Sequence, residues 1–222
     1  THKSKIFCLK FVGDGELAIV GLQDGKVVLQ DLSTQEIIHI FEGHLDSVYS
    51  IAVSSDSTHV LTASSDGSVK IWDIANRIEV FCFDNHEAGV VAVAWVSEAQ
   101  TAISVDSDDV IKIWNVHNGK ELFSGKSELE VITKIAVSRN NKNFVFLSFL
   151  GQIGIYSEEG LSILNSTSSL AHNITITPND QYVLSAENDC TVRMWDLNFY
   201  SSPQEPSHTK EIRDITIQAD NC

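Results

Sequence analysis

Short apolar runs separated by polar turns recur along the whole chain. Examples are Val48–Val53 and Val90–Trp95, and the first is followed by the polar residues 54–57 and then by a second short run, His59–Ser64. Runs of this length, rich in β-branched residues and bounded by Ser and Asp, predict strands. No stretch shows an apolar period of 3.6 residues over the length of a helix. The pattern therefore predicts an all-β fold.

The strand pattern belongs to a repeat of about 42 residues. Three segments place an Asp six residues before a Trp, namely Asp66–Trp72, Asp108–Trp114 and Asp189–Trp195. Weaker copies begin at Asp24 and Leu150, so the aligned positions are separated by 42, 42, 42 and 39 residues. Several short strands in each repeat of this length predict blades of four-stranded antiparallel sheet.

These repeats resemble the WD-repeat family. The resemblance rests on Gly43-His44, Trp72-Asp73 and Trp195-Asp196 with their spacing, and on a His 22 residues before the Asp in two repeats. It covers essentially the whole chain and implies a WD-repeat β-propeller. We expect one propeller portion over residues 1–222, with repeats at about 1–42, 43–84, 85–126, 127–165 and 166–207 and a partial sixth at 208–222.

The expected blades do not close a ring. Five repeats are followed by the start of a sixth, and the N-terminus opens directly into the first repeat without a spare strand. An open ring would leave sheet edges unpaired and apolar blade faces exposed to solvent, which soluble proteins avoid. We therefore expect an incomplete portion of a ring of seven or more blades, within a longer protein; a closed five-blade ring is the alternative.

The resemblance also implies a buried tetrad of His, Ser or Thr, Asp and Trp in each regular repeat. An indole N–H donates only, a hydroxyl donates and accepts, and a carboxylate accepts from imidazole, so the four groups can form a closed chain of hydrogen bonds. The first and fourth repeats depart from the pattern, and the fifth lacks the His. The expected tetrad residues are His44, Thr62, Asp66 and Trp72, then His86, Ser104, Asp108 and Trp114, then Ser185, Asp189 and Trp195.

The family resemblance implies that partner proteins bind one narrow face, through fixed positions in each repeat. Exposed aromatic residues within a polar rim are typical of interaction hot spots, which favours Tyr49 and Phe149 above the others. The alternative for each aromatic residue is packing between blades. The expected partner-binding residues are Phe7, Gln23, Tyr49, Ser65, Ser107, Thr133, Phe149, Leu170, His172 and Asn188.

Residue patterns of catalysis are missing from the sequence. It has no glycine-rich phosphate loop, no His-Glu-x-x-His and no nucleophile elbow, so we expect no catalytic, cofactor-binding or metal-binding residues. The cysteines Cys8, Cys82, Cys190 and Cys222 form no Cys-x-x-Cys pair, which favours free thiols. Acidic pairs such as Asp108-Asp109 are expected in solvated turns.

The formal net charge of −15 narrows the expected partners. Such a surface repels nucleic acid and anionic membranes and favours basic proteins or peptides. No apolar run approaches the length of a transmembrane helix, so we expect a cytoplasmic or nuclear location. Other domains of the same longer chain are further expected partners.

We therefore predict a non-catalytic protein-interaction scaffold, the propeller region of a larger regulatory or signalling protein. One alternative is a substrate-recruiting subunit of an enzyme complex, such as a ubiquitin ligase or chromatin modifier. Another is the ligand-sensing or autoinhibitory propeller of a nucleotide-dependent signalling ATPase. A propeller hydrolase is the least favoured.

Overall fold

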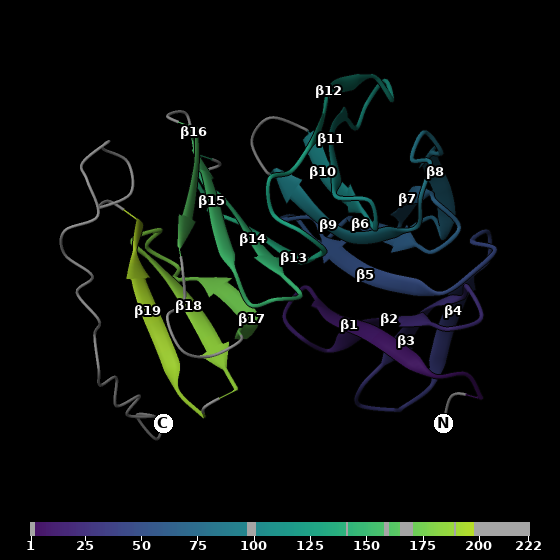
Figure 1. Ribbon diagram of the computed structural model, residues 1–222. Coiled ribbons are helices and arrows are strands. Elements are labelled where there is room, and N and C mark those ends of the chain that lie inside the picture. The colour runs from purple at the N-terminus through teal and green to yellow at the C-terminus, as the bar shows by residue number, and fades with distance from the viewer. Residues whose placement is uncertain are drawn as a thin grey trace, which may run out of the picture. The chain divides into compact units, whose positions relative to one another are not determined.

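The computed structural model describes residues 3–96, 101–140, 142–157, 160–164, 171–188 and 190–197. The prediction of an all-β fold built of antiparallel four-stranded sheets is confirmed (Figure 1). The chain divides into two compact units, residues 1–135 and 136–222, and the boundary falls within β13. No helix long and apolar enough to span a membrane occurs among the described residues.

Four consecutive strands form each of the first three sheets, which we call blades 1 to 3. Blade 1 contains β1 (Ile6–Val12), β2 (Leu17–Leu22), β3 (Val27–Asp31) and β4 (Ile37–Phe41). Blade 2 contains β5 (Val48–Val53), β6 (His59–Ser64), β7 (Val69–Asp73) and β8 (Ile78–Phe83). Blade 3 contains β9 (Val90–Val96), β10 (Thr101–Asp106), β11 (Val110–Asn115) and β12 (Glu121–Lys126).

Two further sheets follow. Blade 4 contains β13 (Ile132–Val137), β14 (Phe144–Ser148), β15 (Ile153–Ser157) and β16 (Gly160–Leu164). Blade 5 has three strands in the described part of the chain, β17 (Ala171–Ile176), β18 (Tyr182–Glu187) and β19 (Val192–Asp196).

Strand direction gives each blade two distinct ends. Because neighbouring strands are antiparallel, the turn between the second and third strands lies at the same end as the segment that links one blade to the next. In blade 2 these are the turn at residues 65–68 and the linker at residues 42–47. We call this end of the blades the linker face.

One residue of each linker-face turn adopts a left-handed conformation. The residues are Gly25, Gly67, Asp109, Gly151 and Cys190, with φ between 64° and 83°. Glycine adopts this region without a steric penalty, and Asp does so more readily than most residues. A Cβ atom added to Gly67 would lie 3.2 Å from the carbonyl oxygen of His86 in blade 3, so the turn is also packed against the next blade.

The apolar core lies between consecutive blades. In the first cluster, Phe41 of blade 1 packs beside Trp72 of blade 2, with ring centroids 5.3 Å apart. In the second cluster, Phe83 of blade 2 lies 4.8 Å from Trp114 of blade 3. A third cluster joins blades 4 and 5 within residues 136–222. Burial of these alternating side chains on both faces of a blade stabilises the stack and positions the linker face.

Candidate functional site

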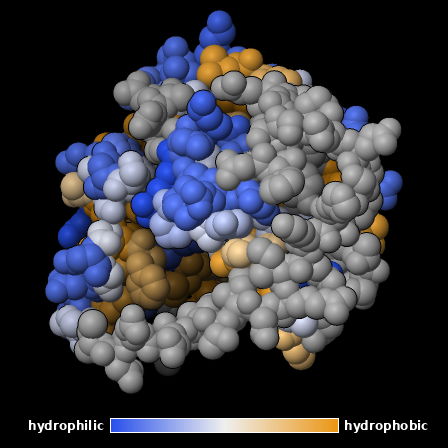
Figure 2. Space-filling model, turned by 90° about the vertical axis from the view of Figure 1, so that its left-hand side faces the viewer, coloured by the Kyte–Doolittle hydropathy of each residue, from blue (hydrophilic) through white to orange (hydrophobic). Residues whose placement is uncertain are grey.

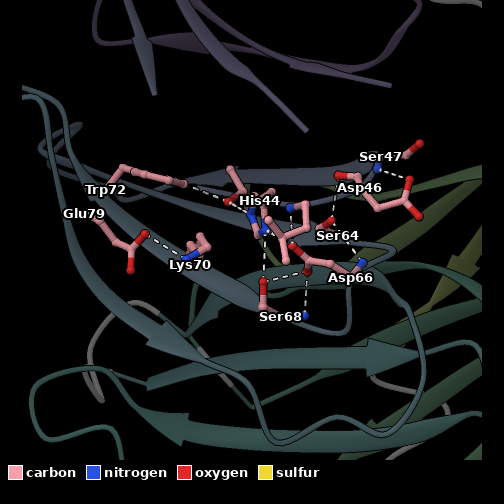
Figure 3. Close-up of polar contacts among 11 residues, drawn as sticks. His44, Asp46, Ser47, Ser64, Asp66, Ser68, Lys70, Trp72 and Glu79 are labelled. Carbon is pink, nitrogen blue, oxygen red and sulfur yellow. Dashed lines mark hydrogen bonds and ion pairs between the residues drawn. The ribbon is translucent and has the colours of Figure 1, made fainter. Parts of the chain in front are cut away.

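Blade 2 carries a continuous chain of hydrogen bonds beneath the linker face (Figure 3). Trp72 Nε1 donates to Thr62 Oγ1 at 2.8 Å, and His44 Nε2 lies 2.7 Å from the same hydroxyl. His44 Nδ1 lies 3.1 Å from Asp66 Oδ2. The four side chains expected to form a tetrad are therefore joined, and they come from β6, β7, the linker and the linker-face turn.

Asp66 also holds the linker to the turn. Its carboxylate accepts hydrogen bonds from the backbone N–H of Leu45 at 2.8 Å and from the hydroxyl of Ser68 at 2.6 Å. Burial alone would raise the pKa of Asp66, but the hydrogen bonds from His44 and Ser68 outweigh it and hold the pKa well below its usual range. Asp66 is thus an ionised acceptor with a structural role.

Blade 3 corrects the expected tetrad by two residues. Its His86 Nδ1 lies 2.8 Å from Oδ2 of Asp106, and not from Asp108 as the sequence spacing suggested. Ser104 and Trp114 occupy the expected places, with Trp114 Nε1 donating to Ser104 Oγ at 2.8 Å. The reason is strand alternation, because β10 continues through Asp106 and residues 104 and 106 project from the same face. Asp108 is exposed in the turn.

His86 is buried, and its surroundings determine which ring nitrogen donates a hydrogen bond and which accepts one. Burial lowers the pKa of His86, against the opposing effect of the hydrogen bond to Asp106. A neutral ring then donates from Nδ1 to Asp106 and accepts at Nε2 from the Ser104 hydroxyl, which lies 2.7 Å away. The Ser104 oxygen accepts in turn from Trp114, so each polar group has a suitable partner.

Blade 5 repeats the shifted arrangement in part. Trp195 Nε1 donates to Ser185 Oγ at 3.2 Å, and Ser185 Oγ donates to Glu187 Oε1 at 2.8 Å. Glu187 therefore holds the strand-end position that Asp106 has in blade 3. The expected carboxylate, Asp189, lies outside the described residues.

Asp109 corrects the expectation that the acidic pair in this turn is solvated. Its side chain is buried, and its two carboxylate oxygens accept the backbone N–H groups of Val131 and Ile132 at 2.9 and 2.8 Å. Asp109 thereby ties the turn of blade 3 to the start of β13. In blades 1 and 2 the same turn position is glycine.

In the described parts of blades 1 and 4, apolar residues stand at positions that tetrad residues hold in blade 2. Val20 replaces the hydroxyl residue in blade 1 and is buried against Val28. In blade 4, Phe146 and Leu147 are almost fully buried, and Leu150 stands in the place of the turn Asp and is half exposed. Apolar packing takes over the role of the hydrogen bonds there.

Two of the expected partner-binding residues form an aromatic pair on the linker face. Phe7 at the start of β1 and Tyr49 in β5 lie edge to face, with ring centroids 5.1 Å apart. They are 36% and 40% exposed, and Lys5 Nζ lies 5.0 Å from the centre of the Phe7 ring. We call Lys5, Phe7 and Tyr49 the aromatic pair site.

The other expected partner-binding residues of blades 1 to 3 are mostly exposed turn residues. Gln23 and Ser107 are exposed and Ser65 is partly buried. The backbone N–H groups of Gln23, Ser107 and Ser65 bond to the carbonyl groups of Lys5, Gly89 and Ser47 respectively, just before the first strand of each blade. The main chain of these turns is therefore fixed while their side chains remain accessible.

The expected residues of blades 4 and 5 differ among themselves. Thr133 is partly buried in β13, whereas Phe149 is 70% exposed in the turn between β14 and β15. His172 and Asn188 are exposed, and His172 Nε2 is in contact with Asn188 Oδ1. Leu170 lies outside the described residues.

Leu45 was missed at the sequence level. It is 90% exposed at the linker face, between His44, which is buried, and Asp46, which is exposed. Its backbone N–H donates to Asp66, which holds the linker in place. The sequence signal was an apolar residue directly after the tetrad His. Because the His side chain points into the core, the side chain of the next residue is expected to point to solvent.

Within the described ranges, no group of three or more His, Cys, Asp or Glu side chains is placed to hold a metal ion. His44 and His86 each have both ring nitrogens engaged within a tetrad. These two histidines therefore help to hold the linkers and turns of the linker face in place.

Comparison with known proteins identifies the family of the chain and a solved structure with a similar fold. The family model described as WD domain, G-beta repeat matches residues 35–73, 77–115 and 163–196, about half of the chain. Each matched segment begins near the fourth strand of one blade and ends with the third strand of the next. No curated protein matches the chain in sequence.

Among solved structures, the chain is similar to one titled "Structure of U3-55K", with a TM-score of 0.80 and 19% sequence identity. The similarity covers 89% of this chain and 63% of that one. At this level of identity the likeness concerns the fold.

Proposed function

Since the chain belongs to the WD-repeat family, whose members generally act as non-catalytic scaffolds that bind other proteins, we propose that its linker face is a protein-binding surface. The finer assignment concerns the place of binding and the chemistry of the partner. We assign binding to the aromatic pair site together with the neighbouring turns of blades 1 and 2.

The observation that carries this assignment is the exposure of the Phe7–Tyr49 pair. Both residues are more than a third exposed, whereas the aromatic residues Phe41 and Trp72 of the same blades are 2% exposed. Aromatic residues held rigidly at a surface lose little conformational entropy on binding and dominate many interfaces. Lys5 beside Phe7 adds a polar rim to the apolar centre.

The acidic surroundings favour a partner with a basic surface. Exposed carboxylates on the linkers and linker-face turns of residues 1–135 include those of Asp24, Glu42, Asp46, Glu87, Asp108, Glu128 and Glu130. Opposite charges speed association and exclude acidic partners, including nucleic acid. Affinity for such a partner should fall as the salt concentration rises.

Replacement of both rings by alanine tests the assignment. Phe7→Ala with Tyr49→Ala should reduce capture of native partners from cell extract about tenfold or more, because truncated hot-spot residues cost about 2 kcal/mol or more. The matched control is Ile78→Ala with Val80→Ala on β8, whose side chains are 54% and 47% exposed. Equal capture by both folded double variants would refute the assignment.

We further propose that this scaffold belongs to a larger regulatory or signalling protein. The acidic linker face supports recruitment of a basic partner, which also suits a subunit that brings substrates to an enzyme complex. The identity of the proteins captured through the aromatic pair site distinguishes these roles: components of a modifying enzyme would favour the second.

A further inference from the structure

Leu45 is the most exposed large apolar residue in the part of the chain that the structure describes, at 90%. Apolar residues reach the surface elsewhere as well. Figure 2, which views the molecule from the left-hand side of Figure 1, shows apolar surface beside hydrophilic residues. Exposure by itself therefore does not mark a contact residue, and the surroundings of Leu45 have to be considered.

Blade 2 holds the main chain on both sides of Leu45. Asp66 in the linker-face turn accepts the backbone N–H of Leu45 at 2.8 Å. Ser64 at the end of β6 donates from Oγ to the carbonyl oxygen of Asp46, also at 2.8 Å. A side chain that projects from a fixed main chain loses less conformational entropy on binding than one in a mobile loop. Leu45 is therefore presented in a well-defined position.

The turn of blade 1 supports the linker from the other side and joins it to the aromatic pair site. Gly25 lies so close that an added Cβ atom would be 2.5 Å from the carbonyl oxygen of His44. Ser47 Oγ donates to the carbonyl oxygen of Gln23 at 3.1 Å, and the Gln23 N–H donates to that of Lys5 at 2.9 Å. The linker and the aromatic pair site therefore belong to one continuous part of the linker face.

The fold does not require an exposed apolar side chain at position 45. The aligned residues of repeats 1 and 3 are Lys3 and Glu87, which are charged and exposed. The aligned residue of repeat 4 is Leu129, which is 1% exposed. A leucine that buries its side chain contributes to folding, whereas Leu45 buries almost none of its surface.

The charge of this part of the linker face is divided. Glu42 and Asp46, both exposed, flank Leu45 in the linker. Lys26 Nζ lies 3.9 Å from Glu42 Oε1, but the side chain of Glu42 is still 73% exposed, and surface pairs of this kind are weak. Lys5 belongs to the aromatic pair site. Carboxylates therefore lie beside Leu45, and an ammonium group lies beside the aromatic pair.

We propose that Leu45 is a contact residue of the linker face and selects a partner segment in which an apolar residue is flanked by Lys or Arg. The apolar residue packs against Leu45, and the flanking cations face Glu42 and Asp46. Apolar contact supplies affinity, whereas the charge pairs supply selectivity. This inference rests on the proposed function and names the chemistry of the partner beside the aromatic pair site.

Photo-cross-linking from position 45 identifies the partner segment itself. In the 222-residue chain, p-benzoylphenylalanine replaces Leu45, and the peptides that become cross-linked in cell extract are sequenced by mass spectrometry. We expect segments with two or more Lys or Arg residues within about four positions of an apolar residue. The control position is Leu122 on β12, which is 52% exposed. Cross-linked segments without basic residues, or the same segments from position 122, would overturn the proposal.

A labelled synthetic copy of the cross-linked segment measures the contribution of each group by fluorescence anisotropy. Leu45→Ser should weaken binding about three- to tenfold at an unchanged melting temperature, because the side chain is exposed. Glu42→Gln with Asp46→Asn should weaken binding and reduce its dependence on salt. Leu122→Ser should bind as the unaltered chain does. Equal affinity of the Leu45→Ser chain and the unaltered chain would overturn the proposal.

The position of the cross-links separates this inference from the proposed function. Cross-links from position 49 without any from position 45 would overturn the role of Leu45 and leave the aromatic pair site in place. Cross-links to a basic segment from position 45 alone would support the role of Leu45 and contradict the assignment of binding to the aromatic pair. Cross-links from neither position would overturn both.

Discussion

At the scale of the residue, the hydroxyl of the second strand is the constant element of the buried networks. Thr62, Ser104 and Ser185 each accept from a Trp indole, whereas the carboxylate comes from either of two positions. It stands in the turn in blade 2, at Asp66, and at the end of the strand in blades 3 and 5, at Asp106 and Glu187. A carboxylate at either position gives the buried polar groups a hydrogen-bond partner. A buried polar group without a partner would lower the free energy of unfolding by about 1–3 kcal/mol.

The shift of the carboxylate in blade 3 has a direct consequence for stability. Asp106→Ala removes the acceptors of His86 Nδ1 and of the backbone N–H groups of Asp108 and Val110, so the free energy of unfolding should fall by about 2–4 kcal/mol. Asp108→Ala should change it by less than about 0.5 kcal/mol, since this side chain is exposed. Urea denaturation of both variants measures the difference. A larger loss for Asp108→Ala would show that the expected spacing, and not the observed one, is correct.

At the scale of the element, blades 2 and 4 hold their strands by different means. Blade 2 combines apolar packing with the tetrad, whereas blade 4 has Phe146 at the position of Thr62 and relies on packing. Hydrogen bonds between turns restrain the ends of strands, while packing restrains mainly their middles. Blade 2 should therefore open less readily than blade 4.

Native-state hydrogen exchange can compare two matched amides. Leu61 in β6 and Val145 in β14 have the same register in their blades and are both fully buried. We expect Leu61 to exchange at least about fivefold more slowly, which corresponds to about 1 kcal/mol of additional protection. Slower exchange at Val145 would show that the tetrad does not determine which blade opens first.

The strands and the repeat could be predicted from the sequence, but the roles of the acidic residues in the turn of blade 3 could not. The strands follow from alternation and period, which are local properties of the sequence. The tetrad carboxylate of blade 3 is Asp106 and not Asp108 because β10 continues as far as residue 106. Three acidic residues stand close together near that end, so the sequence alone did not distinguish them. The role of Asp109 depends on contacts with Val131 and Ile132, more than twenty residues away, which no local pattern contains.

At the scale of the whole molecule, the buried networks and the exposed residues have separate tasks. The tetrads and inter-blade clusters fix the turns, and the aromatic pair site stands on that support with its rings accessible. Loss of a tetrad should therefore reduce stability first, whereas loss of the aromatic pair should reduce binding with little effect on stability.

Site-specific photo-cross-linking determines whether partners bind at the aromatic pair site. The photoreactive residue p-benzoylphenylalanine would replace Tyr49, which is 40% exposed, or Val80 on β8, which is 47% exposed. On irradiation in cell extract, we expect discrete cross-linked partner proteins from position 49 and none, or far fewer, from position 80. Equal cross-linking at both positions, or none at position 49, would contradict the assignment of binding to this site.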